Sequence, residues 1–144
     1  MYVCAIKDVF SNRIVGLAIS DRMQARLATD ALRDAIKQRG AANIKSCIVH
    51  SDRGGQFRSR SYLTMLKHHD LRQSMGQVQT CADNAAMESF FSLLQRNVFN
   101  QKTWNSRHEL RHAVTRWIDT TYHTKRRQRA LNKLTPIEYE LIMT

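Results

Sequence analysis

Apolar and polar positions in the first part of the chain predict two strands followed by a helix. Residues 2–6 and 13–19 are rich in apolar and β-branched side chains, and the short polar turn between them predicts an antiparallel hairpin. Asp21 and Gln24 have the spacing of a capping box, so we expect a helix from there to about residue 38. Its apolar stripe is Leu27, Ala31, Leu32 and Ala35.

The middle of the chain predicts a strand, a helix and a second short strand. Residues 46–51 contain a brief apolar run, residues 58–69 have helical spacing of apolar side chains, and residues 71–74 favour a strand. Residues 76–82 are small and polar, which predicts a loop. Strands and helices in this order indicate an α/β fold with mixed strand pairing.

The rest of the chain is predicted to be helical. From about Asn84, apolar side chains recur three and four residues apart, and Glu88 lies at the edge of that stripe. Ser106 and Thr135 have N-cap patterns that predict two further helices. The stripe consists of Met87, Phe90, Phe91, Leu94 and Val98, and its spacing is typical of a core.

Composition narrows the class of protein. The chain has 144 residues and 42% hydrophobic content, which fits one domain, residues 1–144, with a real core. It has no run of about 18 apolar residues, so we expect neither a transmembrane helix nor a membrane partner. Three scattered cysteines, and an N-terminus without a basic region before its apolar stretch, favour a reduced cytoplasmic protein.

Positive charge is concentrated in the second half of the chain. A net charge of +11 favours a polyanionic partner, with nucleic acid first and an acidic membrane surface as the alternative. Residues 95–133 contain ten Lys and Arg and two acids, which gives +8. This region overlaps the basic helical part of the chain, at about residues 100–144. Such clustering favours a phosphate-facing surface over a solvated one. The densest run contains Lys125, Arg126, Arg127 and Arg129.

Two carboxylates are candidate ligands of a metal ion. Asp52 closes an apolar strand, Glu88 lies near the start of a helix, and 35 residues separate them. Hard divalent cations prefer carboxylate oxygens. Alternatively, Asp52 caps the following turn and Glu88 favours the positive end of a helix. Gly54 and Gly55 are expected to permit a tight turn and a close backbone approach.

Two motifs make the chain recognisable. The sequence HSDRG at residues 50–54, followed by DNAAMESFF at residues 83–91, resembles the integrase core (rve-type, DDE) of bacterial insertion-sequence OrfB-type transposases. More distantly it resembles retroviral integrases. The resemblance extends to residues 8–16 and 122–139 and so covers nearly the whole chain. Ordered motifs at matching spacing are more specific than a single short motif.

This resemblance implies a ribonuclease-H-like mixed sheet with flanking helices, and metal-dependent phosphoryl transfer on DNA. Asp52 and Glu88 would be catalytic and would bind Mg²⁺ or Mn²⁺. The transfer would comprise strand nicking and strand transfer by a 3′-hydroxyl. Partners would be DNA and other transposase subunits in a homo-oligomer, at the bacterial nucleoid. The DNA-binding candidates are Arg53, Asn84, Arg96, Lys125, Arg126, Arg127 and Arg129.

The chain also departs from the family pattern. The family's first Asp lies on a strand that nothing in this sequence matches, and Asp8 aligns with a non-catalytic position. We therefore expect an N-terminally truncated core without the first, central strand, and impaired catalysis. The alternative is a non-catalytic remnant that binds DNA or other subunits. The missing strand would leave two unpaired edges, closed by self-association or by direct pairing of the neighbouring strands.

Overall fold

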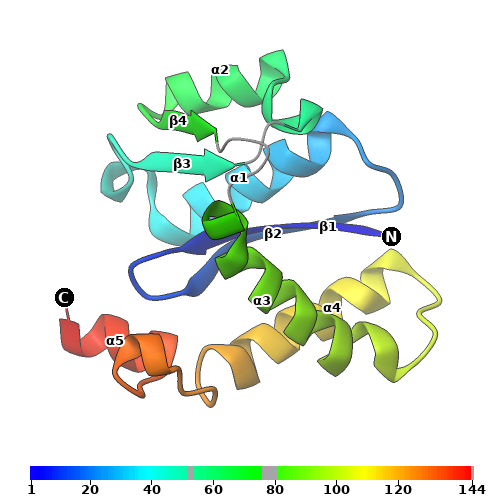
Figure 1. Cartoon of the computed structure of the whole chain (residues 1–144). Helices are drawn as coiled ribbons and strands as arrows, with labels where there is room; N and C mark the ends of the chain where they lie inside the picture. The colour runs from blue at the N-terminus through cyan, green and yellow to red at the C-terminus, as the bar shows by residue number, and fades with distance from the viewer. Residues whose placement is uncertain (52–53, 76–80, 144) are drawn as a thin grey trace. The chain divides into compact units, whose positions relative to one another are not determined.

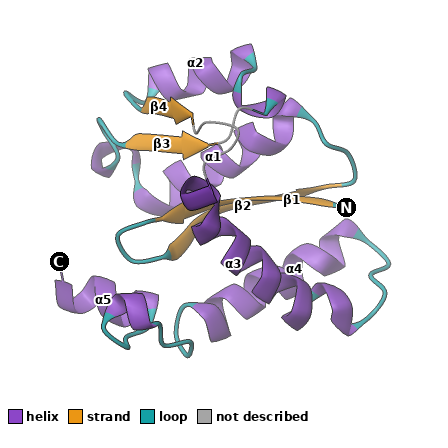
Figure 2. Cartoon of the chain, in the orientation of Figure 1, coloured by secondary structure: helices purple, strands orange, loops and turns teal. Residues whose placement is uncertain are grey.

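The computed structural model describes residues 1–51, 54–75 and 81–143, with the backbone alone at residues 81–86. The strands lie in the first part of the chain and helices follow from residue 81 onward (Figure 1, Figure 2). The chain divides into two compact units. The first comprises residues 1–6 and 15–89, and the second comprises residues 7–14 and 90–144.

A hairpin and a helix open the chain. β1 (Tyr2–Asp8) and β2 (Arg13–Ser20) form a two-stranded sheet, and their short connection permits only antiparallel pairing, as predicted. α1 (Ala25–Arg39) follows and ends at Gly40, whose φ of 84° favours glycine. The predicted capping box is wrong, because the helix begins at Ala25 and Gln24 makes no side-chain cap.

Close packing of α1 on β2 depends on Gly16. A Cβ atom at Gly16 would clash with the Ala31 carbonyl oxygen and lie 3.0 Å from the Ala35 Cβ. Strand and helix backbones can therefore approach closely only at a residue without a side chain. The Asp34 carboxylate also accepts a hydrogen bond of 2.9 Å from the Leu17 amide, which ties α1 to β2.

The second sheet of the first unit is parallel. β3 (Ile48–Ser51) pairs with β4 (Arg72–Met75), and α2 (Arg60–His68) connects them. The predicted strands and helix therefore exist, with ends shifted by one or two residues. Ser59 caps α2 by accepting a hydrogen bond of 3.2 Å from the Tyr62 amide. The core under this sheet contains Ala28, Leu32, Tyr62 and Leu66.

Among the described residues, the strands form two separate sheets. β1 pairs with β2 alone and β3 pairs with β4 alone, although Ile6 of β1 and Val49 of β3 pack against the same core cluster. Of the two expected ways to close the gap, direct pairing of the strand at residues 2–6 with the strand before Asp52 is therefore wrong, and self-association stays a prediction. Residues of α1 pack against strands of both sheets, but no hydrogen-bonded ladder joins the two sheets in the part of the chain that the structure describes.

Three helices dominate the second part of the chain. These are α3 (Cys81–Asn97), α4 (Arg107–Trp117) and α5 (Pro136–Met143), and α3 continues from the first unit into the second. The helical region of the second unit buries side chains at Phe90, Leu94, Val98, Leu110, Val114, Ile118 and Tyr122. No described helix is long and apolar enough to cross a membrane.

Local sequence sets the beginnings of the last two helices, as predicted. Ser106 accepts a hydrogen bond of 3.0 Å from the Glu109 amide at the start of α4. At α5, the Thr135 hydroxyl accepts from the Glu138 amide, and the Glu138 carboxylate accepts from the Thr135 amide. These two hydrogen bonds form a complete capping box, and the bond from the Thr135 amide to the carboxylate is the main cause that lowers the pKa of Glu138.

Candidate functional site

The end of β3 leads directly to Asp52. β3 stops at Ser51, which is in register with Met75 of β4, while Asp52 and Arg53 lie outside the described residues. The carboxyl ends of parallel strands meet at one edge of a sheet, which is where open α/β sheets bind ligands. His50 Nδ1 lies 3.0 Å from the Ser74 hydroxyl. His50 therefore has a polar partner beside the strand end.

The turn that follows differs from the expectation. Gly54 has a φ of −59°, which any residue adopts, and a Cβ atom at Gly55 would meet nothing within 4 Å. Neither glycine has positive φ, and the expected close backbone approach is wrong at Gly55, although the chain does form a tight turn here. Local hydrogen bonds form the turn instead, and the Gln73 side chain donates one of 2.6 Å to the Phe57 carbonyl.

Glu88 lies on the exposed face of α3. The buried side chains Phe90 and Leu94 anchor this helix on its other face. Within the described part of the chain, the Glu88 carboxylate makes no hydrogen bond or ion pair. α3 begins at Cys81, so Glu88 lies beyond the first turn and the helix-dipole interpretation is wrong.

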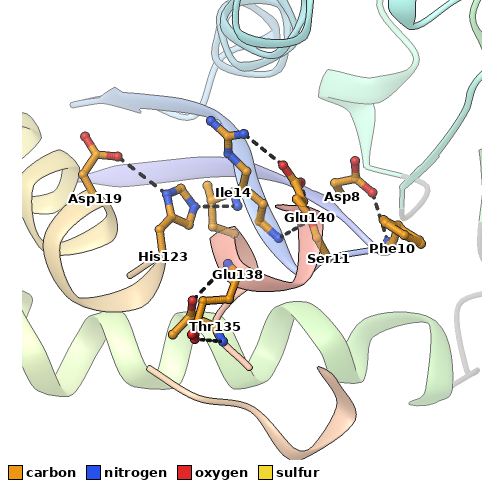
Figure 3. A network of polar contacts seen from close by, with 10 residues as sticks. Asp8, Phe10, Ser11, Ile14, Asp119, His123, Thr135, Glu138 and Glu140 are labelled. Carbon is orange, nitrogen blue, oxygen red and sulfur yellow. Dashed lines mark hydrogen bonds and ion pairs between the residues drawn. The ribbon is translucent and has the colours of Figure 1, made fainter. Parts of the chain in front are cut away.

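Asp83 and Asn84 lie inside the first turn of α3 because the helix begins at Cys81. Their side chains lie outside the described residues, so the interpretation that they cap the helix stays a prediction. Asp8 is occupied locally, since its carboxylate accepts a hydrogen bond of 3.0 Å from the Phe10 amide (Figure 3). This contact joins the end of β1 to the following turn, and the assignment of Asp8 outside the catalytic set stays a prediction.

The donor chemistry of the predicted pair fits a hard divalent cation. Asp52 and Glu88 would both offer carboxylate oxygens, the ligands that Mg²⁺ and Mn²⁺ prefer. Of this pair the structure describes Glu88, an exposed carboxylate on a helix held by its buried face. Across residues 1–51, 54–75 and 81–143, no group of three His, Cys, Asp or Glu side chains could hold a metal.

The predicted DNA contacts lie in different environments. Arg96, Lys125, Arg126 and Arg129 are exposed, with Arg96 in the last turn of α3. Arg127 is 63% exposed, but its guanidinium lies 3.5 Å from the Glu138 carboxylate and donates to the Lys133 carbonyl. One member of the densest basic run therefore also stabilises the C-terminal segment.

The sequence did not predict the burial or the hydrogen bonds of Tyr122 and His123. Both side chains are buried, and the Tyr122 hydroxyl donates a hydrogen bond of 3.0 Å to the Asn12 carbonyl. His123 Nε2 accepts one of 3.0 Å from the Ile14 amide, so the ring proton lies on Nδ1, 3.6 Å from Asp119 (Figure 3). Burial raises the pKa of Tyr122. The one available signal was the presence of this pair among the family motifs.

The α5 helix holds the same hairpin turn. The Ser11 hydroxyl donates a hydrogen bond of 2.5 Å to Glu140, and the Arg13 guanidinium forms an ion pair of 3.1 Å with the same carboxylate (Figure 3). A π-helical turn at Ile118–Tyr122 precedes His123, whose amide donates to the Ile118 carbonyl. The extra residue of such a turn changes which side chains face inward. It leaves the adjacent Tyr122 and His123 both buried.

Comparison with protein families decides the relationship. A family model described as the integrase core domain matches residues 1–81, which is more than half of the chain. The chain belongs to the integrase core domain family. A second model with the same description matches residues 69–136. The resemblance inferred from the HSDRG and DNAAMESFF motifs is therefore confirmed.

Transposases are among the relatives of this integrase core domain. The transposase InsF for insertion sequence IS3A of Escherichia coli K12 is 37% identical over 140 residues, which are 97% of this chain and 48% of InsF. The putative transposase InsK for IS150 of the same organism is 34% identical over 139 residues, 96% of this chain and 48% of InsK. The chain thus spans about half the length of these curated relatives.

Solved structures establish the fold. The HTLV-2 integrase catalytic core domain, solved with magnesium, has a TM-score of 0.64 at 14% identity, covering 96% of this chain and 91% of that one. A chain of the simian T-cell lymphotropic virus intasome, in complex with a PP2A regulatory subunit, has a TM-score of 0.74 at 14% identity, with coverages of 95% and 47%. The predicted ribonuclease-H-like α/β class is therefore confirmed.

Proposed function

We propose that this integrase core domain takes part in DNA transposition by metal-dependent phosphoryl transfer. The reaction comprises nicking of a DNA strand and joining of the freed 3′-hydroxyl to another site. The observation that carries the proposal is the family match together with the two motif acids, Asp52 directly after β3 and Glu88 on the exposed face of α3. The relatives InsF and InsK are themselves named as transposases.

Asp52 and Glu88 are the proposed ligands of Mg²⁺ or Mn²⁺. The metal, when bound, polarises phosphate oxygens and promotes attack by a hydroxyl oxygen. The protein contributes the position of the carboxylates. Glu88 belongs to a helix whose opposite face is buried, and Asp52 follows a strand that is paired along its whole length with β4. Such rigid supports suit a reaction that depends on geometry.

We further propose that the 144 residues alone have little activity. They hold two of the three acids that the family uses, so a bound metal would lack a ligand. A second candidate function is binding of DNA or of other transposase subunits without catalysis. The separation of the described strands into two sheets favours this candidate, because a catalytic site across a sheet needs a continuous support.

The proposed partners are DNA and further transposase subunits, at the nucleoid of a bacterial cytoplasm. The second unit carries the larger share of the positive charge: its 12 Lys and Arg and five acids give +7, against 11 and seven, or +4, in the first unit. Homo-oligomer formation is proposed because the HTLV-2 neighbour has dimeric and trimeric forms. The proposed DNA contacts are Arg53, Asn84, Arg96, Lys125, Arg126, Arg127 and Arg129.

Calorimetric titration with Mn²⁺ tests the metal site. Asp52→Asn and Glu88→Gln should each weaken Mn²⁺ binding, while Asp21→Asn, which neutralises an exposed acid after β2, should leave it unchanged. Nicking of a labelled element end is measured in parallel. Equal Mn²⁺ affinity in all four proteins would refute the proposed ligands. DNA binding without metal-dependent nicking would favour the non-catalytic candidate.

A further inference from the structure

Gln73 is a polar side chain on the core side of β4. Its partner in the β3–β4 register is Val49, and Val49 packs against the core cluster under this sheet. Side chains in register on neighbouring strands project to the same face of a sheet. An apolar residue is expected at such a position, because a polar group that is removed from water needs a hydrogen-bonding partner. The presence of a glutamine here indicates a specific polar contact.

The partner of Gln73 is the turn that follows β3. The Gln73 side chain donates a hydrogen bond of 2.6 Å to the carbonyl of Phe57, which closes the 3₁₀ turn Gly55–Phe57. The Phe57 amide donates one of 3.0 Å to the Gly54 carbonyl. The Phe57 ring packs edge-to-face on Tyr62, with ring centroids 5.6 Å apart. The turn is therefore held by the core through the Phe57 ring and by β4 through Gln73.

β4 thus supports the chain on both sides of Asp52. Before Asp52, Ser51 is in register with Met75 of β4, and after it Gln73 holds the turn at Phe57. Asp52 and Arg53 lie outside the described residues, and they are the two residues that join Ser51 to Gly54. A link of three peptide steps spans at most about 11 Å. A displacement of the turn is therefore transmitted to Asp52 through a short connection.

We infer that Gln73 is a positioning residue for Asp52. This inference rests on the proposed function, because it takes Asp52 as a ligand of the metal. Loss of a group that orients a metal ligand typically lowers metal affinity by about 10–100-fold. Gln73 acts through the turn and not on the carboxylate itself, so we expect an effect of about tenfold, at the lower end of that range.

The variant Gln73→Met tests this role in the full chain. Methionine has a similar length and suits an apolar environment, but it has no donor for the Phe57 carbonyl. Calorimetric titration with Mn²⁺ should show an affinity about tenfold lower than that of the wild type. Hydrogen exchange at the Phe57 amide, measured without metal, should be roughly two- to tenfold faster, as for the loss of one net hydrogen bond.

Two controls separate positioning from general destabilisation. Gln101→Met removes the same kind of contact from the second unit, a hydrogen bond of 2.8 Å from the Gln101 side chain to the Arg96 carbonyl. His123→Leu removes the acceptor of the buried Ile14 amide and so lowers stability, also in the second unit. Both variants should keep the Mn²⁺ affinity of the wild type. If either lowers it as much as Gln73→Met does, the inference is overturned.

The inference and the proposed function fail with different results. Mn²⁺ affinity that falls in Asp52→Asn and Glu88→Gln but not in Gln73→Met would overturn the inference and leave the proposed ligands in place. Faster exchange at Phe57 together with unchanged Mn²⁺ affinity would also overturn it, because Gln73 would then stabilise the turn alone. Unchanged affinity in Asp52→Asn would overturn the proposed ligand and the positioning role together.

Discussion

Replacement of His123 by leucine should destabilise the protein through one backbone amide. His123 is 5% exposed, and its Nε2 accepts a hydrogen bond of 3.0 Å from the Ile14 amide. Leucine fills much of the same space but offers no acceptor, so the buried Ile14 N–H loses its partner. An unsatisfied buried donor of this kind reduces the free energy of unfolding by about 1–3 kcal/mol.

The size of this destabilisation can be measured by thermal unfolding. For a chain of 144 residues, an unfolding entropy of about 2.1 cal/mol/K per residue converts this loss into a decrease in Tm of roughly 3–10 °C. Hydrogen exchange gives a local measurement as well, because the Ile14 amide should lose protection in His123→Leu. The substitution leaves both groups of the nearby Tyr122–Asn12 hydrogen bond in place, so we expect that contact to remain.

His123→Gln is the matched control. A glutamine side chain can place its amide oxygen near the position of Nε2 and accept the hydrogen bond from Ile14. We expect this variant to lie closer to the wild type than His123→Leu in both Tm and exchange. If the two variants are equally destabilised, the loss comes from packing of the ring, and the hydrogen-bond explanation is refuted.

Two further predictions concern the sheets. Gly16→Ala should reduce the free energy of unfolding, measured by urea denaturation, by about 1–3 kcal/mol, because the new Cβ clashes with the Ala31 carbonyl oxygen. The control Gly55→Ala should be nearly neutral, because its Cβ meets nothing within 4 Å. Equal effects would contradict the packing argument. An added N-terminal segment carrying the family's strand and Asp should pair with β1 and β3, raise the Tm and permit metal-dependent nicking, whereas a proline-substituted copy of that strand should not. An unmoved Tm would show that the two sheets need no further strand.

Much of the secondary structure could be predicted because its signals are local. The caps at Ser106 and Thr135 act within three residues of themselves, and the helices that they begin are present as expected. The spacing of apolar side chains likewise indicated the buried face of α3. The same local rule failed at Asp21 and Gln24, because the chain leaves β2 through a bend before α1 begins at Ala25.

The candidate site could be predicted in part for a similar reason. Asp52 and Glu88 belong to short motifs with a characteristic order and spacing, so the sequence alone was enough to select them. The structural environment of each acid could not be predicted from the sequence. Whether Glu88 lies in the first turn of a helix depends on where that helix begins, and local signals define helix ends poorly.

Contacts between distant segments were decided by the tertiary structure alone. His123 and Ile14 are 109 residues apart, and Ser11 and Glu140 are 129 residues apart. The charged residues show the same contrast between sequence and packing. The number of arginines is a property of the sequence, but only packing decides that Arg127 meets Glu138 and that the arginines of α4 are exposed to solvent. Periodicity and capping act over one or two helical turns, whereas these pairs form only when the whole chain has packed around its core.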